Sequence, residues 1–389
     1  MKKLLLALFC AASLNAEGIE NFLSADYNEL FDLQLQKSQK DADYDSLSWI
    51  SPVTLSYERS WNTQTPGTNS ATNTLSIGID QPIFKSGGIF YAIKYAKSNL
   101  RVTSANIIKS KLSLKGSAVE LALKIKETKF VIKKLKLQLR NRDIEINSAQ
   151  ELYSAGLSDG VTLDNALVKK DEAKIALLDM ESNLEALRAS FSKISDKNPD
   201  TIRVPHLKVP SKEQYLSHNI DLDIAQAKTL LAQNLHSVKR SAYLPTVSVG
   251  ARYTKLSKAQ VGRNDAFTNY SLRVSMPLSV NVGNDLERSK LSSMIAKVEE
   301  KNSIREAKAD YATARKKVAI IQKRINLAKR EARAYRRLLK STRELYRAGQ
   351  KSSQDVELLE NSKRVQQLDI KIYSIEKELA ILELHKKVR

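Results

Sequence analysis

The chain has 389 residues, of which 28% are charged, with only 12 Gly and 8 Pro. This composition favours helices and excludes collagen-like chains and Pro/Gly-rich disorder. The formal net charge of +21 suggests nucleic-acid binding as one function to consider. However, Lys and Arg are interspersed with Glu and Asp, and no basic block is interleaved with aromatic residues. We therefore expect no nucleic-acid partner.

The N-terminus predicts an export signal over residues 1–16. Met1-Lys2-Lys3 is basic, Leu4 to Ala12 is apolar, and Ala16 is a small residue at the expected cleavage point. Cys10 is the only cysteine. It is either discarded with the signal or a lipid attachment site, for which the bulky Phe9 is a poor neighbour. No later stretch reaches 18 apolar residues, so a chain that crosses a membrane must use strands.

Residues 17–195 form a predicted first repeat, which begins with a short helix over 19–40. A β-hairpin follows over 52–84, because apolar and polar residues alternate there: Val53, Leu55, Tyr57 and Trp61 share one face. Pro82 and the glycines after it mark a switch from strand to helix.

A long helical hairpin completes the first repeat. Between Gly88 and Tyr153 there is no Pro and one Gly, and Ala118, Ile125 and Ile132 recur every seven residues. This spacing predicts a coiled-coil helix. The chain turns back near Gly156, which gives the hairpin a tip.

The second half of the chain repeats this order after a linker over 196–211. Residues 212–389 predict a helix over 213–243, a β-hairpin over 245–278 and a helical hairpin with its tip near Gly349. Leu345-Tyr346-Arg347-Ala348-Gly349 repeats Leu152-Tyr153-Ser154-Ala155-Gly156, 193 positions later. The two halves therefore share one architecture.

The predicted strands are apolar on one face and polar on the other. About ten residues per strand with this alternation suits an outer-membrane barrel, although a half-buried soluble sheet shows the same pattern. Four strands cannot close around a pore, so a membrane role requires several chains to share one barrel.

This order of elements, present twice after an export signal, resembles that of the TolC-like outer-membrane efflux proteins (the outer membrane factor family). Ser241-Ala242-Tyr243-Leu244-Pro245 resembles the family's entry into the second hairpin. The resemblance implies a mainly α fold with a small β part: a long α-helical coiled-coil barrel, plus four β-strands per chain in a trimeric twelve-stranded transmembrane β-barrel.

The resemblance also implies location and partners. The homotrimer would sit in outer-membrane lipid with its helical part in the periplasm. It would be a passive exit duct, opened by a periplasmic adaptor (membrane fusion protein) and an inner-membrane pump of the RND or ABC type.

Site residues follow from the same resemblance. The adaptor would contact the tips at Ala155, Gly156, Leu157, Ala348, Gly349 and Gln350. Either glycine is equally a plain helix cap. Asp355 falls on an acidic aperture position, where three copies would favour cations, or is simply a first-turn carboxylate. Tyr346 and Lys351 match positions that hold the closed state, and their acidic partner falls on Thr162.

We expect no enzyme. The four histidines are scattered and show no metal-ligand spacing, and neither a nucleophile elbow nor a phosphate loop occurs. Catalytic residues, cofactors and metals are therefore not predicted. The alternative function is a periplasmic coiled-coil scaffold without a pore, in which the hairpins would form a soluble sheet.

Overall fold

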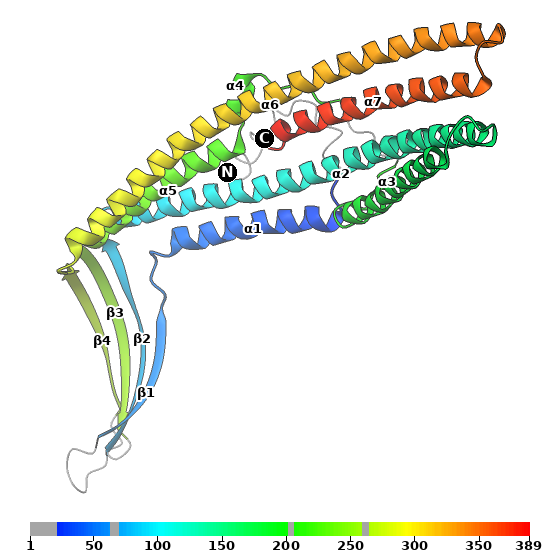
Figure 1. The fold of residues 1–389 in the computed structure, drawn as a ribbon. Helices are drawn as coiled ribbons and strands as arrows, with labels where there is room; N and C mark the ends of the chain where they lie inside the picture. Colours follow the sequence, from blue (N-terminus) through cyan, green and yellow to red (C-terminus); the bar gives the residue numbers. More distant parts are fainter. Residues whose placement is uncertain (1–21, 63–69, 201–205, 259–263) are drawn as a thin grey trace. The chain divides into compact units, whose positions relative to one another are not determined.

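The computed structural model describes residues 22–62, 70–200, 206–258 and 264–389. The predicted signal peptide, including Cys10, lies outside these ranges. The described chain is mainly helical with one small sheet (Figure 1). Its elements in chain order are α1 (Ala25–Leu47), β1 (Thr54–Asn62), β2 (Ser70–Phe84), α2 (Gly88–Ser154), α3 (Gly160–Ser192), α4 (Lys212–Ser217), α5 (Ile220–Ala242), β3 (Thr246–Lys258), β4 (Asn264–Ser275), α6 (Val282–Arg347) and α7 (Ser353–His385).

The chain divides into two compact units. The first, which we call the tip unit, comprises the described residues of 1–31 together with 109–220 and 306–389. The second, the sheet unit, comprises 32–108 and 221–305. Each unit takes segments from both sequence repeats. The two sequence repeats therefore do not coincide with the two compact units.

The sheet unit contains a four-stranded antiparallel sheet in the order β1-β2-β3-β4. The register places Leu55 opposite Ile77, Ile77 opposite Tyr253, and Val249 opposite Leu272. The strands are longer than the alternation alone predicts, since β2 begins at Ser70 and β3 runs to Lys258. Among the described helices, none has the length and apolarity that crossing a membrane requires.

Pro82 does not end the β-ladder as the sequence suggested. It pairs with Ser248, and β2 continues to Phe84 with an irregular register between the two. The pairing of β1 with β2 stops at Gly78, so this end of β2 has β3 as its partner and β1 no longer lies beside it. The missing N–H of proline therefore removes no bond to a strand on that side.

Three helices pack together at the helical end of the sheet unit. The Asn234 side chain of α5 donates to Ser98 of α2 at 2.7 Å, and Lys239 of α5 pairs with Asp285 of α6 at 2.8 Å. Gly88 starts α2 where a Cβ would lie 2.8 Å from the Ser241 hydroxyl. Glycine thus lets the two helix ends approach closely.

The tip unit is held by an apolar core between α2, α3, α6 and α7. The predicted sevenfold stripes lie in this core, which confirms them as packing seams. Buried members include Ala118, Ile125 and Ile132 of α2, Leu177, Leu184 and Phe191 of α3, and Val365, Ile372, Ile375 and Leu382 of α7.

Two helices differ from their predicted bounds. The expected helix over 213–243 is broken at residues 218 and 219, because the chain end pairs with it there: Asn219 bridges Val388, and Arg389 N–H donates to His218 O at 2.9 Å. The first helix was expected over 19–40. Its described part begins at Ala25 and ends at Leu47, and the chain before Pro52 lacks a helix breaker that would stop it at residue 40.

Candidate functional site

The two tips of the tip unit close with the same backbone hydrogen bonds. At the end of α2, Gly156 N–H donates to Tyr153 O at 3.0 Å and Leu157 N–H to Leu152 O at 2.9 Å. At the end of α6, Gly349 N–H donates to Tyr346 O at 3.0 Å, and the next amide repeats the second bond at 2.9 Å. This is the Schellman arrangement of a helix end. The sequence repeat is thus reproduced in geometry.

Both tip glycines have a left-handed backbone, with φ of 69° at Gly156 and 74° at Gly349. A non-glycine residue is strained in this conformation. A Cβ placed at either glycine would meet no described atom within 4 Å. The glycines are therefore required for the turn, and the space beside them is open. Ala155, Leu157, Ala348 and Gln350 flank them and are all exposed.

The returning helices start with different caps. Asp159 caps α3: its carboxylate accepts from the Thr162 N–H at 3.0 Å and from the Thr162 hydroxyl at 2.7 Å. Ser352 caps α7: its hydroxyl accepts from Asp355 N–H at 3.1 Å, and Asp355 Oδ2 accepts from Ser352 N–H at 3.0 Å. The first tip therefore has its carboxylate at the cap position (Asp159), and the second tip has its carboxylate at the third helical position (Asp355).

Both carboxylates are stabilised in their charged form. Hydrogen bonds from the Thr162 hydroxyl and amide hold the pKa of Asp159 below its usual value. The Ser352 N–H does the same for the pKa of Asp355, assisted by the Ser352 hydroxyl and by Lys351. Lys351 Nζ lies 3.6 Å from Asp355 Oδ1. Each tip therefore carries a permanent anion at neutral pH, and the second tip has a cation beside it.

The predicted gate residues are divided between the tips. Lys351 and Asp355 contact each other across the start of α7, and Tyr346 lies in the last turn of α6 and is about half exposed. In the other tip, the hydroxyl of Thr162 donates a hydrogen bond to the carboxylate of Asp159. Within the part of the chain that the structure describes, no hydrogen bond or ion pair joins Thr162 to Tyr346 or Lys351. Sequence reasoning missed Asp159 as the cap, although an Asp three residues before Thr162 at a helix start is a recognisable signal.

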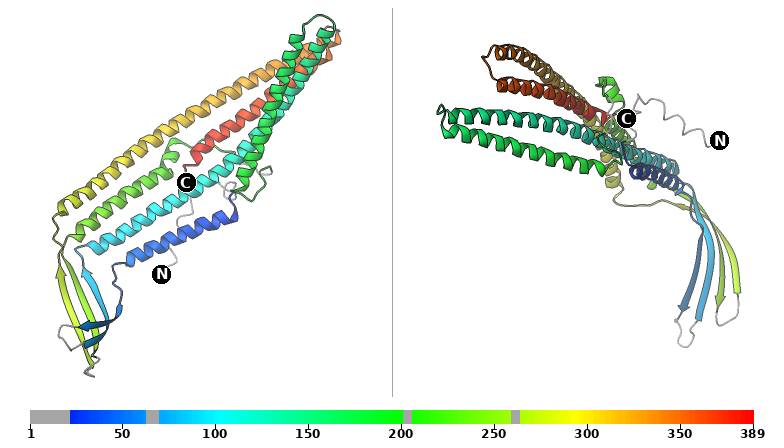
Figure 2. Two further views of the ribbon diagram at one scale, coloured as in Figure 1. Left: turned by 60° about the horizontal axis from the view of Figure 1, so that its bottom comes forward. Right: turned by 90° about the vertical axis from the view of Figure 1, so that its right-hand side faces the viewer.

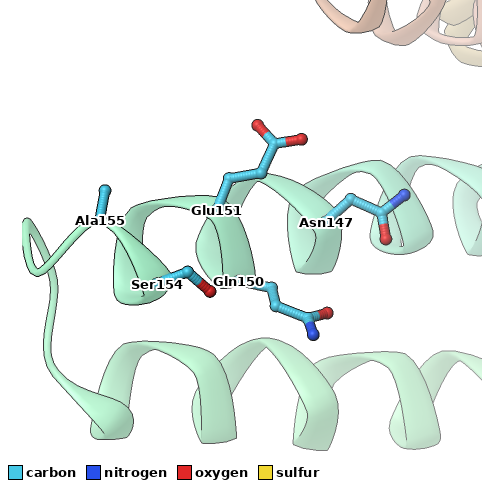
Figure 3. Close-up of a pocket in the computed structure, with 5 residues that line it drawn as sticks. All are labelled: Asn147, Gln150, Glu151, Ser154 and Ala155. Atoms are coloured by element: carbon cyan, nitrogen blue, oxygen red, sulfur yellow. The ribbon is translucent and has the colours of Figure 1, made fainter.

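A polar cleft adjoins the first tip. It has a volume of about 540 Å³ and is lined by Asn147, Gln150, Glu151, Ser154 and Ala155. The first four belong to the end of α2, and Ala155 follows it where the chain turns back (Figure 3). Amide, hydroxyl and carboxylate groups here offer hydrogen bonds to a partner. Across the described residues, no three His, Cys, Asp or Glu side chains gather in a way that could hold a metal ion.

The sheet unit carries the second candidate surface, the apolar face of its sheet. Leu55, Tyr57, Tyr270 and Leu272 point to this face and are largely exposed, Leu272 by 72%. The opposite face is polar: Ser76 is 6% exposed, and its hydroxyl lies 2.8 Å from that of Ser56, while Ser56, Asp80 and Ser271 on the same face are exposed. Water-soluble sheets bury the apolar face and expose the polar one. This sheet leaves its apolar face exposed.

Comparison with known proteins identifies the fold. No family model and no curated protein matches the sequence. Solved structures do: an outer membrane protein, VceC of Vibrio cholerae, has a TM-score of 0.72 at 16% identity over 96% of both chains. The CmeC outer membrane channel of Campylobacter jejuni has a TM-score of 0.74 at 16% identity, over 94% of this chain and 84% of its own.

A third similar structure shows a channel in its open state. The open state of the MtrE outer membrane channel of Neisseria gonorrhoeae has a TM-score of 0.72 at 13% identity, over 95% of this chain and 87% of its own. The chain therefore has the fold of outer-membrane channel proteins, as the sequence resemblance predicted. Of these three proteins, CmeC and MtrE are outer membrane channels.

Proposed function

We propose that three copies of the chain form a passive channel through the outer membrane, with the helices in the periplasm. The observation that carries this proposal is the sheet, whose large apolar side chains are exposed along one face. Lipid is the surrounding in which such a face is stable. In the chain-order sheet β1 and β4 are the edges, so pairing β4 of each copy with β1 of the next would close a ring of twelve strands.

The test is conductance. The full-length protein, extracted from the outer-membrane fraction, is expected to run as a heat-sensitive trimer and to conduct ions in planar lipid bilayers. A protein that stays in the soluble fraction and never conducts would instead support the periplasmic scaffold, in which the sheet has no membrane role.

We further propose that the tips dock a periplasmic adaptor, which links the channel to an inner-membrane pump of the RND or ABC type. Open space at Gly156 and Gly349 supports this, because a helical hairpin could approach the backbone there. The exposed Leu157 offers an apolar contact, and the polar cleft beside it offers hydrogen bonds. In vivo cross-linking from a photoreactive residue at Leu157 is expected to trap a periplasmic protein. Labelling of nothing but the channel itself would count against docking at the tips.

The second tip would form the periplasmic aperture. Three copies of Asp355 around one opening would favour cations, while Tyr346, Lys351 and Thr162 would take part in the closed state. The caps place Asp159 beside Thr162, so the acidic group that the first tip offers to a partner is Asp159.

A further inference from the structure

One side of α6 is densely basic in the half of the helix that belongs to the tip unit. Residues 315–347 carry thirteen Lys or Arg and two Glu, and α7 runs beside them (Figures 1 and 2). Alternating steps of three and four residues in both directions from Arg333 reach fifteen positions, Arg333 included, on one side of the helix. Eleven of the fifteen are Lys or Arg. We call these eleven cations, which run from Arg315 to Arg347, the basic arc.

The basic arc is exposed and largely without counter-charges. All eleven side chains are exposed. Arg343 lies 3.4 Å from Glu360 of α7, and the other ten form no ion pair within the described ranges of the chain. Many are also four residues apart, such as Arg333 and Arg337, a spacing at which like charges destabilise a helix. The basic arc therefore works against the stability of α6, so a structural role does not account for it.

The first repeat shows that the turn itself does not require these cations. The residues 193 positions before the last three cations of the arc are Asn147, Gln150 and Ser154. They precede the same kind of turn and are also exposed, since they line the polar cleft (Figure 3). The same solvated helix end is thus built without cations in one copy and with them in the other. The positive charge at the second tip is therefore not a requirement of the fold.

The shape of the basic arc suits an extended polyanion. From Arg315 to Arg347 it follows about 48 Å of helix, at 1.5 Å per residue. Ala319 is the only apolar residue among the fifteen positions, and the exposed Leu327 and Leu338 lie outside them. Stable protein–protein interfaces have an apolar core within a polar rim. The basic arc has no such core, and what it offers to a ligand is positive charge along a line.

The proposed aperture favours a basic arc that faces outward. A tunnel wall that carried these cations would repel the cations that a ring of Asp355 admits, because fixed charge of one sign along a pore excludes ions of that sign. The outside of the proposed helical part meets the periplasm. Peptidoglycan is the extended polyanion of that compartment, since the peptide stems on its glycan strands carry free carboxylates.

We propose that the basic arc of α6 binds the carboxylates of peptidoglycan and so holds the helical part of the channel in that layer. The inference rests on the proposed periplasmic location of the helices and adds a binding surface to the proposed duct. Arg and Lys form charge-assisted hydrogen bonds with carboxylates. A row of such contacts on one polymer is multivalent, and because the groups are exposed, it weakens as salt screens them.

Co-sedimentation with purified peptidoglycan sacculi tests the contact. The full-length protein in detergent is expected to sediment with the sacculi and to be released as the salt concentration rises. The triple variant Lys323→Gln, Arg330→Gln and Arg337→Gln removes a central row of the arc and should lower the apparent affinity by at least about tenfold. Gln forms helices as readily as Lys or Arg, so the helical content should not change. Sacculi whose carboxylates have been converted to amides should retain little wild-type protein.

A matched control removes the same charge elsewhere in the tip unit. Lys169→Gln, Lys174→Gln and Lys193→Gln alter three exposed cations of α3 and its C-cap. This control variant should sediment with sacculi as the wild type does. Equal losses in both triple variants would mean that net charge alone governs retention, and the basic arc would then not be the binding surface.

Other outcomes also overturn the inference. Wild-type protein that does not sediment with sacculi, or retention that survives amidation or neutralisation of the arc, would do so. Retention by vesicles of anionic phospholipid but not by sacculi would assign the arc to lipid. Changed ion selectivity of the arc variant, with sacculus binding intact, would assign it to the lumen. The proposed channel is judged separately by conductance: the arc variant should conduct as the wild type does, whereas a wild type that never conducts would remove the channel, whatever it binds.

Discussion

At the scale of single residues, the two tips share a turn and differ in charge placement. The positive φ at both tips requires glycine. Lack of space does not require it, because a Cβ at either position would meet no described atom within 4 Å. The cap role and the docking role can therefore be separated by substitution. A residue that tolerates the left-handed backbone tests space alone, and one that does not tests the turn.

Gly349→Asn and Gly349→Ala form such a pair. Asn adopts the left-handed conformation readily, so Gly349→Asn should leave the thermal unfolding midpoint almost unchanged. Gly349→Ala should destabilise the tip by about 1 kcal/mol. If an adaptor docks against the glycine backbone, both variants lose export of a fluorescent dye from cells. Normal export by Gly349→Asn would show that the glycine is a cap and nothing more.

The caps predict a dependence on pH. Because the pKa of Asp355 is lowered in the folded chain, its cap stabilises the folded state above the unfolded pKa of about 3.9 and is lost as pH falls through the lower folded value. The helical circular-dichroism signal should therefore melt earlier at pH 3 than at pH 7. In Asp355→Asn this difference should shrink, since the amide does not titrate over that range; an unaltered difference would exclude Asp355 as its source.

At the scale of elements, the sheet exposes large apolar side chains on one face and carries polar residues on the other. Arg273 of β4 lies 3.4 Å from Asp80 of β2 on the polar face, and Ser56 and Ser76 pair nearby. A soluble half-buried sheet, the alternative that the sequence left open, would need its apolar face to be covered. The same substitution by Lys should therefore have opposite effects at two adjacent positions of one strand, because their side chains lie on opposite faces of the sheet.

Leu272→Lys and Ser271→Lys place one cation on each face of β4. In lipid, Lys at Leu272 should cost up to about 2–4 kcal/mol, depending on its depth. Ser271 lies on the row of Gly250 and Asp80, so Lys there should be tolerated. The measurement is the amount of heat-modifiable trimer recovered from outer membranes. Equal recovery from both variants would mean that the apolar face does not meet lipid.

Gly116, the sole glycine inside α2, accommodates a side chain of α7. A Cβ there would lie 2.4 Å from Lys386 Cγ, and Lys386 is held by Glu120 at 2.5 Å and Glu383 at 2.7 Å. Gly116→Ala should thus destabilise the chain in chemical unfolding by displacing Lys386. In a Lys386→Ala background the same change should stabilise by up to about 1 kcal/mol, through helix propensity. Additive effects in this double-mutant cycle would mean that the two residues do not interact.

Local periodicity predicted most of the elements, and distant pairing explains the misses. Ile125 and Leu177 could be assigned to packing seams because coiled-coil spacing is visible in any window of two heptads. The break at His218 could not be predicted, since it depends on residues 387–389 at the far end of the chain. Pro82 is tolerated because β2 pairs only with β3 at that end. This too could not be predicted, since it depends on where β1 stops pairing with β2.

At the scale of the whole molecule, the proposed function depends on what three copies would place around one axis. A group that is a helix cap in one chain would become part of a ring in that assembly. Asp355 already satisfies the cap of α7 through one oxygen, and its other oxygen faces Lys351 at 3.6 Å. The charge of an aperture built there is thus set by two opposing groups, and their removal should have opposite effects.

Asp355→Asn and Lys351→Gln test the aperture as such a pair. Asn retains an oxygen for the Ser352 amide, so Asp355→Asn keeps the cap while the ring loses three negative charges. The reversal potential under a KCl gradient should move away from the cation-selective limit. Lys351→Gln exposes the same carboxylates, so its reversal potential should move toward that limit. Asp159→Asn, in the first tip, removes a similar carboxylate from a different place and serves as the control. If both second-tip variants match the wild type, or if Asp159→Asn alone shifts the potential, the narrowest charged ring lies elsewhere in the channel.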